Sequence, residues 1–102
     1  MKFKFENAIY DIEITSKFKS GYKKIRKQGK NIEKLIDVLE TLANGDELDK
    51  KYKNHKLIDD KTYKDYFECH IAPDWLLIYK IKDNELVLLL FSTGSHSELF
   101  EK

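Results

Sequence analysis

Two apolar segments near the end of the chain constrain the fold most. Residues 86–91 read Leu-Val-Leu-Leu-Leu-Phe, a continuous apolar run that is typical of a strand in the centre of a sheet. Residues 75–81 form a second, largely apolar run, and the polar turn Lys82-Asp83-Asn84 separates the two. A third strand is predicted over residues 63–70, before the break in hydrogen bonding that Pro73 imposes. The second half of the chain therefore predicts three neighbouring strands.

The first half adds one strand and two helices. Apolar and acidic residues alternate over residues 10–14, which predicts a half-buried strand. Apolar residues then recur at helical spacing over residues 18–25 and 32–42, with a short turn at Gly29 between them. Residues 46–62 are polar and predict a long loop. The fold class expected is α+β: one domain over residues 1–102, with an N-terminal strand and an αα-hairpin packed on a mainly antiparallel four-stranded sheet.

Composition excludes several classes of protein. No apolar run approaches the roughly 20 residues of a membrane helix, and the first residues lack the apolar core of a signal peptide. The single cysteine, Cys69, excludes an internal disulfide and a cysteine-rich zinc site. Together these observations predict a cytoplasmic protein without a membrane partner.

Charge is unevenly distributed. Residues 1–30 contain nine Lys and Arg against three Asp and Glu, whereas residues 31–102 contain ten against fifteen. A dense basic face attracts polyanions without sequence preference, although a solvated helix face has the same composition. The predicted contacts to an RNA backbone are Lys19, Lys23, Lys24, Arg26 and Lys27.

Three histidines suggest acid–base chemistry. His55 lies in the polar loop, His70 lies near the end of a predicted strand, and His96 follows the last strand. Asp74 opens the strand after His70, so an antiparallel pair would bring these two residues close together. Imidazoles titrate near neutral pH and can both accept and donate a proton, as cleavage of a phosphodiester requires. A metal site formed by the three histidines and Asp74 is the alternative, although no short His-x-His spacing supports it.

Three aromatic residues near these positions are candidate surfaces for an unstacked RNA base. They are Trp75, Tyr66 and Phe100. Packing in the core is the alternative for each of them.

Three segments carry a resemblance to a known family. Residues 52–55 (Tyr-Lys-Asn-His), residues 66–79 with their His-Ile-Ala-Pro-Asp-Trp core, and residues 93–100 (Thr-Gly-Ser-His-Ser-Glu-Leu-Phe) resemble the YafQ family of bacterial toxins, within the RelE/ParE superfamily. The resemblance covers nearly the whole chain from about residue 10. It implies the toxin of a type II toxin–antitoxin system, a ribosome-dependent endoribonuclease that cuts mRNA without a metal or cofactor. The implied partners are a cognate antitoxin, the ribosome and mRNA.

The resemblance also implies roles for individual residues. His96 is expected to be the principal acid–base residue. The expected assisting residues are His55, His70 and Asp74, and the residues expected to shape the substrate site are Trp75 and Phe100. The histidine set argues against the gyrase-directed branch of the superfamily.

One position departs from the pattern. Members of the family commonly have Arg immediately before Thr-Gly-Ser/Thr-His, and this chain has Ser92. A guanidinium would bind the scissile phosphate through two hydrogen bonds, whereas a hydroxyl is a single neutral donor. Either a lysine such as Lys53 or Lys56 binds the phosphate, or the chain is a catalytically weakened module that mainly binds its antitoxin. The expected antitoxin is small and acidic or amphipathic, and covers the basic helical face and the cleft.

Overall fold

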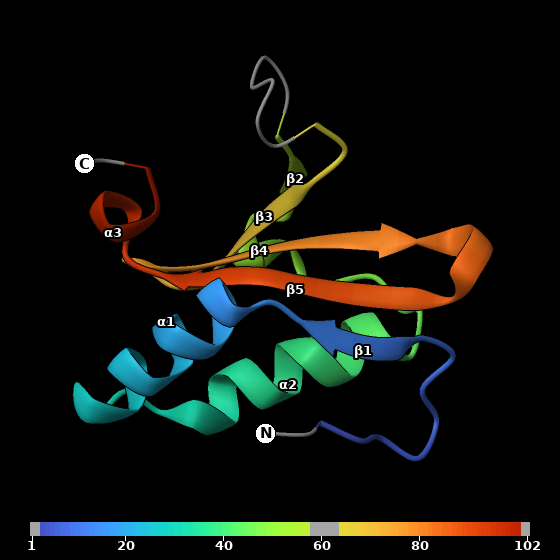
Figure 1. Ribbon diagram of the computed structural model, residues 1–102, viewed down its shortest axis with the longest axis horizontal. Helices are drawn as coiled ribbons and strands as arrows, with labels where there is room; N and C mark the ends of the chain where they lie inside the picture. The colour runs from blue at the N-terminus through green and yellow to red at the C-terminus, as the bar shows by residue number, and fades with distance from the viewer. Residues whose placement is uncertain (1–2, 58–63, 101–102) are drawn as a thin grey trace.

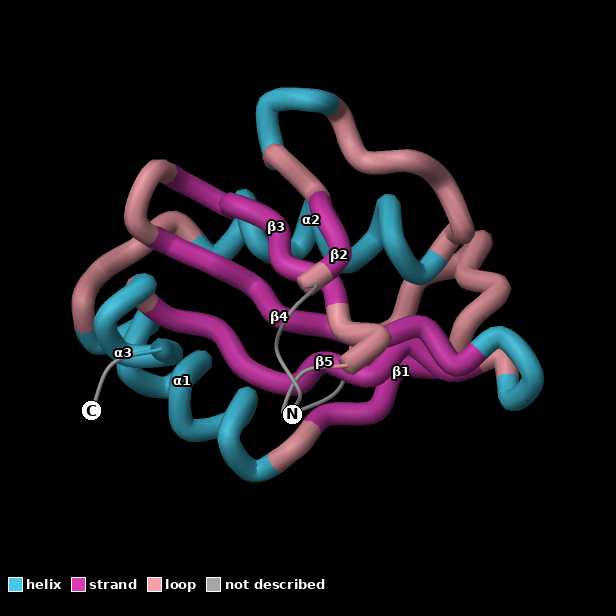
Figure 2. Tube along the Cα trace, turned by 90° about the horizontal axis from the view of Figure 1, so that it is seen from above, coloured by secondary structure: helices cyan, strands magenta, loops and turns pink. Residues whose placement is uncertain are grey.

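A mixed sheet of five strands forms the middle of the molecule in the computed structural model, which describes residues 3–57 and 64–100 (Figure 1). The strands are β1 (Asp11–Ile14), β2 (His55–Lys56), β3 (Phe67–Ala72), β4 (Trp75–Lys82) and β5 (Val87–Gly94). Their order across the sheet is β1-β5-β4-β3-β2, and Figure 2 shows them side by side. β1 runs parallel to β5, and the other neighbouring pairs are antiparallel.

The predicted fold class is confirmed, but the sheet has one strand more than expected. The predicted loop over residues 46–62 contains the 3₁₀ helix η1 (Lys50–Tyr52) and the short strand β2. β2 pairs with β3 through His55 opposite Glu68 and Lys56 opposite Phe67. A strand of two residues is too short to show an alternation of polarity in the sequence. β2 is recognised only by its pairing with β3. The predicted start of the third strand, at residue 63, lies outside the described residues.

Two helices cover one face of the sheet, as predicted (Figure 1). They are α1 (Ser16–Lys27) and α2 (Ile32–Ala43). Thr15 caps α1 by accepting a hydrogen bond from the Phe18 N–H at 3.0 Å, and Asn31 caps α2 in the same way. Their buried side chains, including Phe18 and Leu35, pack against alternate residues of β4 and β5. Within the described residues, no helix has the length and apolar character needed to cross a membrane.

A glycine inside α1 permits its close packing on β5. A Cβ atom built on Gly21 would lie less than 3.0 Å from the carbonyl oxygen of Thr93, closer than real Cβ atoms come. The helix therefore contacts the strand backbone directly, which explains a residue that otherwise weakens a helix by about 1 kcal/mol.

The opposite face of the sheet, here called the outer face, is covered only in part by the residues that the structure describes. The short helix α3 (His96–Phe100) lies on this side, beside the end of β5 (Figure 1). Its Leu99 packs with Leu76 and Ile78 of β4 in a second apolar cluster. α3 thereby brings His96 beside the outer face.

Candidate active site

The register of the strands places two of the histidines on the outer face. His55 is paired with Glu68, and Glu68 is paired in turn with Ile78. Residues that are directly opposite on neighbouring strands share a face, as do residues two apart on one strand. His70 follows Glu68 by two residues, so all of these side chains lie on the side that Ile78 occupies, away from α1 and α2.

Glu68 lies between two imidazoles. Its Oε1 is 3.4 Å from His55 Nε2 and 3.5 Å from His70 Nε2. His55 Nδ1 is 2.9 Å from the Lys53 carbonyl oxygen, which can only accept, so Nδ1 carries a proton and Nε2 faces Glu68. Glu68 is 8 % exposed, and its carboxylate can form an ion pair with either ring when that imidazole is protonated. Sequence reasoning missed this carboxylate, although its spacing of two residues from His70 on a strand was a usable signal.

His96 belongs to a second group of residues on the same side of the sheet. Its ring lies 4.9 Å from the ring of Phe100, measured between centroids. Its backbone N–H donates to Asp74 Oδ1 at 3.3 Å. Asp74 thus binds the first turn of α3 and not the imidazole itself, so the geometry supports a positioning role for this carboxylate.

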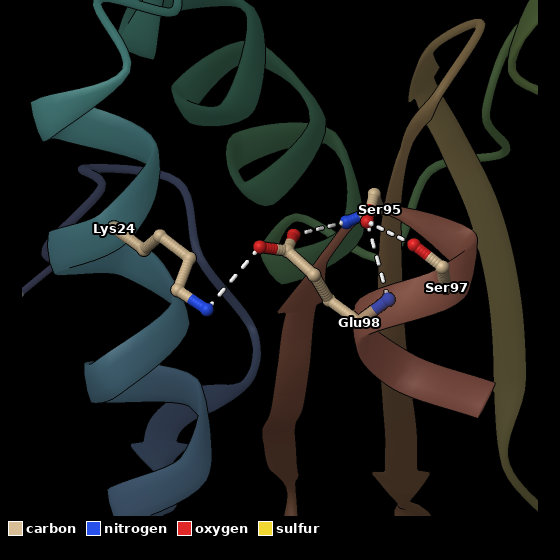
Figure 3. Close-up of polar contacts among 4 residues, drawn as sticks. All are labelled: Lys24, Ser95, Ser97 and Glu98. Carbon is tan, nitrogen blue, oxygen red and sulfur yellow. Dashed lines mark hydrogen bonds and ion pairs between the residues drawn. The ribbon is translucent and has the colours of Figure 1, made fainter. Parts of the chain in front are cut away.

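A capping box and an ion pair fix α3 (Figure 3). Ser95 N–H donates to Glu98 Oε1 at 2.8 Å, and Glu98 N–H donates to Ser95 Oγ at 3.2 Å. Glu98 Oε2 also lies 3.3 Å from Lys24 Nζ on α1. The Ser95 backbone N–H, and secondarily Lys24, lower the pKa of Glu98. The helix that carries His96 is therefore attached to α1 through one carboxylate.

β4 separates the two groups. His70 is opposite Leu76, and Leu76 is opposite Gly94, two residues before His96. Two strand spacings correspond to about 10 Å between the backbones of His70 and Gly94. The three histidines therefore form two groups that flank β4. In the described parts of the chain, no three His, Cys, Asp or Glu side chains are arranged to hold a metal ion.

Trp75 lies on the helix side of the sheet and is 1 % exposed. Its indole N–H donates to Thr93 Oγ1 at 2.9 Å, and Thr93 Oγ1 donates to the Leu76 carbonyl oxygen at 2.7 Å. The ring joins β4 to β5 and offers no surface for a base to stack on. Cys69 is also buried on this side, as its alternation with His70 predicts.

Both lysines proposed to replace the family arginine lie near the His55 and His70 group, since the Lys53 carbonyl oxygen is 2.9 Å from His55 Nδ1 and Lys56 follows His55 on β2. Lys56 Nζ lies 3.5 Å from Asp65. Lys53 lines a hollow of about 500 Å³ that α2, η1 and the β3–β4 turn enclose, with His70 at its border. Ser92 is 1 % exposed on β5, and its Oγ has no hydrogen-bond partner among the described residues. The five predicted RNA-backbone residues are all exposed on α1.

Comparison with known proteins decides the family. The model of the family described as "Bacterial toxin of type II toxin-antitoxin system, YafQ" matches residues 10–101. The chain belongs to the YafQ family of type II toxins. The resemblance found in the sequence is thereby confirmed.

Relatives agree in sequence and in fold. The mRNA interferase toxin YafQ of Escherichia coli is 38 % identical over 92 residues, which cover 88 % of this chain and 95 % of the relative. A metal-bound toxin from Helicobacter pylori is 44 % identical with a TM-score of 0.80, and the match covers 87 % of this chain and 97 % of that one. The E. coli DinJ–YafQ complex contains a chain that is 36 % identical with a TM-score of 0.80, covering 89 % of this chain and 98 % of that one.

Proposed function

We propose that this YafQ-family toxin is an mRNA interferase that cuts mRNA on the ribosome in the bacterial cytoplasm. The observation that carries the proposal is the placement of imidazoles on both sides of β4, on a face of the sheet that α1 and α2 leave uncovered. The curated relative of the same family is an mRNA interferase, and the match covers nearly its whole length.

Cleavage proceeds by proton transfer in this proposal. One imidazole removes the proton of a 2′-hydroxyl, whose oxygen attacks the adjacent phosphorus. The bond from phosphorus to the 5′-oxygen breaks, and a second imidazole protonates that oxygen. The products are a 2′,3′-cyclic phosphate and a 5′-hydroxyl. His96 supplies one proton-transfer group, and His70, held by Glu68, supplies the other; His55 orients Glu68 from the far side.

A translating extract tests the proposal. Three proteins are added to the extract at the same concentration: the wild-type chain, His96→Ala and His70→Ala. The rate of mRNA cleavage and the end groups of the RNA products are measured with and without a chelator. Each histidine variant is expected to cleave 10²- to 10⁴-fold more slowly. Ser97→Ala is the matched control, because Ser97 is exposed beside His96 on α3. Equal cleavage by wild type and His96→Ala, or 3′-hydroxyl products that require a metal, would contradict the mechanism.

An antitoxin is the second partner proposed. The E. coli relative forms a complex with DinJ, and the exposed basic residues of α1 suit an acidic segment that lies over α1 and α3. Coexpression with the product of the adjacent reading frame, followed by purification, tests this. Tight copurification and relief of growth arrest are expected, and failure of both would count against the toxin–antitoxin assignment.

A module that binds an antitoxin without cutting RNA is the alternative that Ser92 favours, because its buried hydroxyl brings no charge to the outer face. Expression of the chain alone separates the two functions. Growth arrest that His96→Ala relieves supports the nuclease, whereas harmless accumulation of folded protein supports the module.

A further inference from the structure

Two lysines are held over a pair of aromatic rings next to the histidines. Lys80 Nζ lies 5.4 Å from the centroid of the Tyr66 ring, and Lys17 Nζ lies 5.3 Å from the centroid of the Phe91 ring. The two rings contact each other edge to face, with centroids 5.1 Å apart. Two ammonium groups therefore flank a single aromatic pair, here called the lysine–aromatic patch.

This patch belongs to the outer face. Tyr66 and Phe91 pack with Leu76 and Ile78 in the outer apolar cluster. Lys80 follows Ile78 by two residues on β4, and Tyr66 precedes Glu68 by two residues. A step of two residues along a strand is about 7 Å. The patch thus forms the next row of side chains beside the row that contains Glu68 and Ile78.

The two ammonium groups are available to an anion. The ion pairs of the described part of the chain use Lys24, Lys56 and Lys82, and none of them involves Lys17 or Lys80. A cation over an aromatic ring is held by the quadrupole of the ring but keeps its hydrogen-bond donors. The rings therefore restrict the motion of both lysine side chains before a ligand binds, which lowers the entropic cost of binding.

We propose that Lys80 and Lys17, held by Tyr66 and Phe91, bind phosphates of the single-stranded RNA next to the bond that is cut. This inference rests on the proposed function, and it places the RNA backbone over the lysine–aromatic patch on the outer face of the sheet. Phosphate is favoured over a stacked base because each ring already has an ammonium group over it. Ser92, one residue after Phe91, supplies no charge, so these lysines are the cations that face the substrate on this row.

Binding to an uncleavable RNA tests the inference. The probe is a 2′-O-methyl oligonucleotide, and affinity is measured between 50 and 300 mM salt for wild type and for Lys17→Gln/Lys80→Gln. Each lost contact to a single-strand phosphate lowers the slope of log K against log salt by about 0.7, so the double variant is expected to lose about 1.4. Its affinity at low salt should fall by about tenfold or more. Lys4→Gln/Lys30→Gln removes the same charge from exposed positions outside the patch and should leave the slope near that of wild type.

The outcomes separate the inference from the proposed function. An unchanged salt slope in the Lys17/Lys80 variant, with normal cleavage by the wild type, overturns the inference alone. Absence of wild-type binding at low salt also overturns it. A second probe with abasic nucleotides should show the same loss of slope, and a loss confined to the probe with bases would instead assign the rings to base stacking. Equal cleavage by wild type and His96→Ala in the extract would overturn the proposed function.

Discussion

Replacing Gly21 by alanine tests the close approach of α1 to β5. The added Cβ would lie less than 3.0 Å from the Thr93 carbonyl oxygen, and ordinary contact begins at 3.4 Å. The Thr93 carbonyl oxygen is part of the backbone and the added Cβ is fixed to it, so a change of side-chain rotamer cannot relieve this clash. To restore ordinary contact, α1 and β5 must separate by about 1 Å over a packed interface.

Two opposing effects set the size of the change. Alanine raises helix propensity by about 1 kcal/mol over glycine. Overpacking against a backbone costs up to about 3 kcal/mol, so the folded state should lose about 2 kcal/mol in net stability. For a domain of this size, that corresponds to a fall in Tm on the order of 10 °C. RNA cleavage should fall as well, because Thr93 lies three residues before His96.

Thermal and urea unfolding followed by circular dichroism measure the effect. Ser20→Ala is the matched control, because Ser20 is exposed at the preceding position of α1 and gains only helix propensity, at most about 0.5 kcal/mol. A Gly21→Ala protein as stable as the wild type, or more stable, would refute the reasoning, since propensity would then outweigh the contact between helix and strand.

Three further predictions follow from the site and the core. Glu98→Gln should lower stability at neutral pH by about 1 kcal/mol, because the charge that pairs with Lys24 and strengthens the capping box is lost. The pKa of Glu98 is lowered in the folded state, so its contribution is present above the unfolded pKa and is lost as the pH falls through the folded pKa; wild type and variant should converge in acid-series unfolding. Burial raises the pKa of the Cys69 thiol to about 12, so thiol reagents at pH 8 should modify the protein only after urea unfolds it. Trp75→Phe leaves Thr93 without its donor and should cost about 2 kcal/mol in urea unfolding while the RNA affinity of the folded protein stays unchanged.

Each of these has a result that would contradict it. For Glu98, the contradiction would be a stability difference that persists unchanged at low pH. For Cys69, it would be rapid labelling of the folded protein, and for Trp75 a loss of RNA affinity without a loss of stability.

The helices and long strands could be predicted because each shows a repeating pattern of polarity. The stripe over residues 32–42 became α2, and the apolar runs became β4 and β5. β2 could not be predicted in this way, because two residues show no periodicity and depend on pairing with β3. β5 also extends to Gly94, past the apolar run, because Ser92 and Thr93 continue the pairing with β4.

Residue type was enough to nominate the members of the candidate site, but it could not predict their arrangement. The histidines and Asp74 stand out by residue type, and the structure brings them to one side of the sheet in two groups. Which atoms face one another depends on register, so Asp74 binding a backbone N–H and Glu68 joining two rings emerged only in three dimensions. Trp75 was expected to contact the substrate, but it is buried in the core. The sequence motif contains the same tryptophan whether its side chain faces RNA or the core, so the motif alone could not distinguish the two.

The parallel pairing of β1 with β5 has a consequence for how the toxin is made. Ile14 is opposite Leu90, so the first strand and α1 find their partner only after most of the chain has left the ribosome. Until then Phe18 and Ile25 lack the surface that buries them, and contacts of such long sequence separation form slowly. Fragments released before β5 is translated therefore cannot assemble the sheet or place α3 on it. Interrupted synthesis therefore yields unfolded fragments that proteases can degrade, and no active toxin.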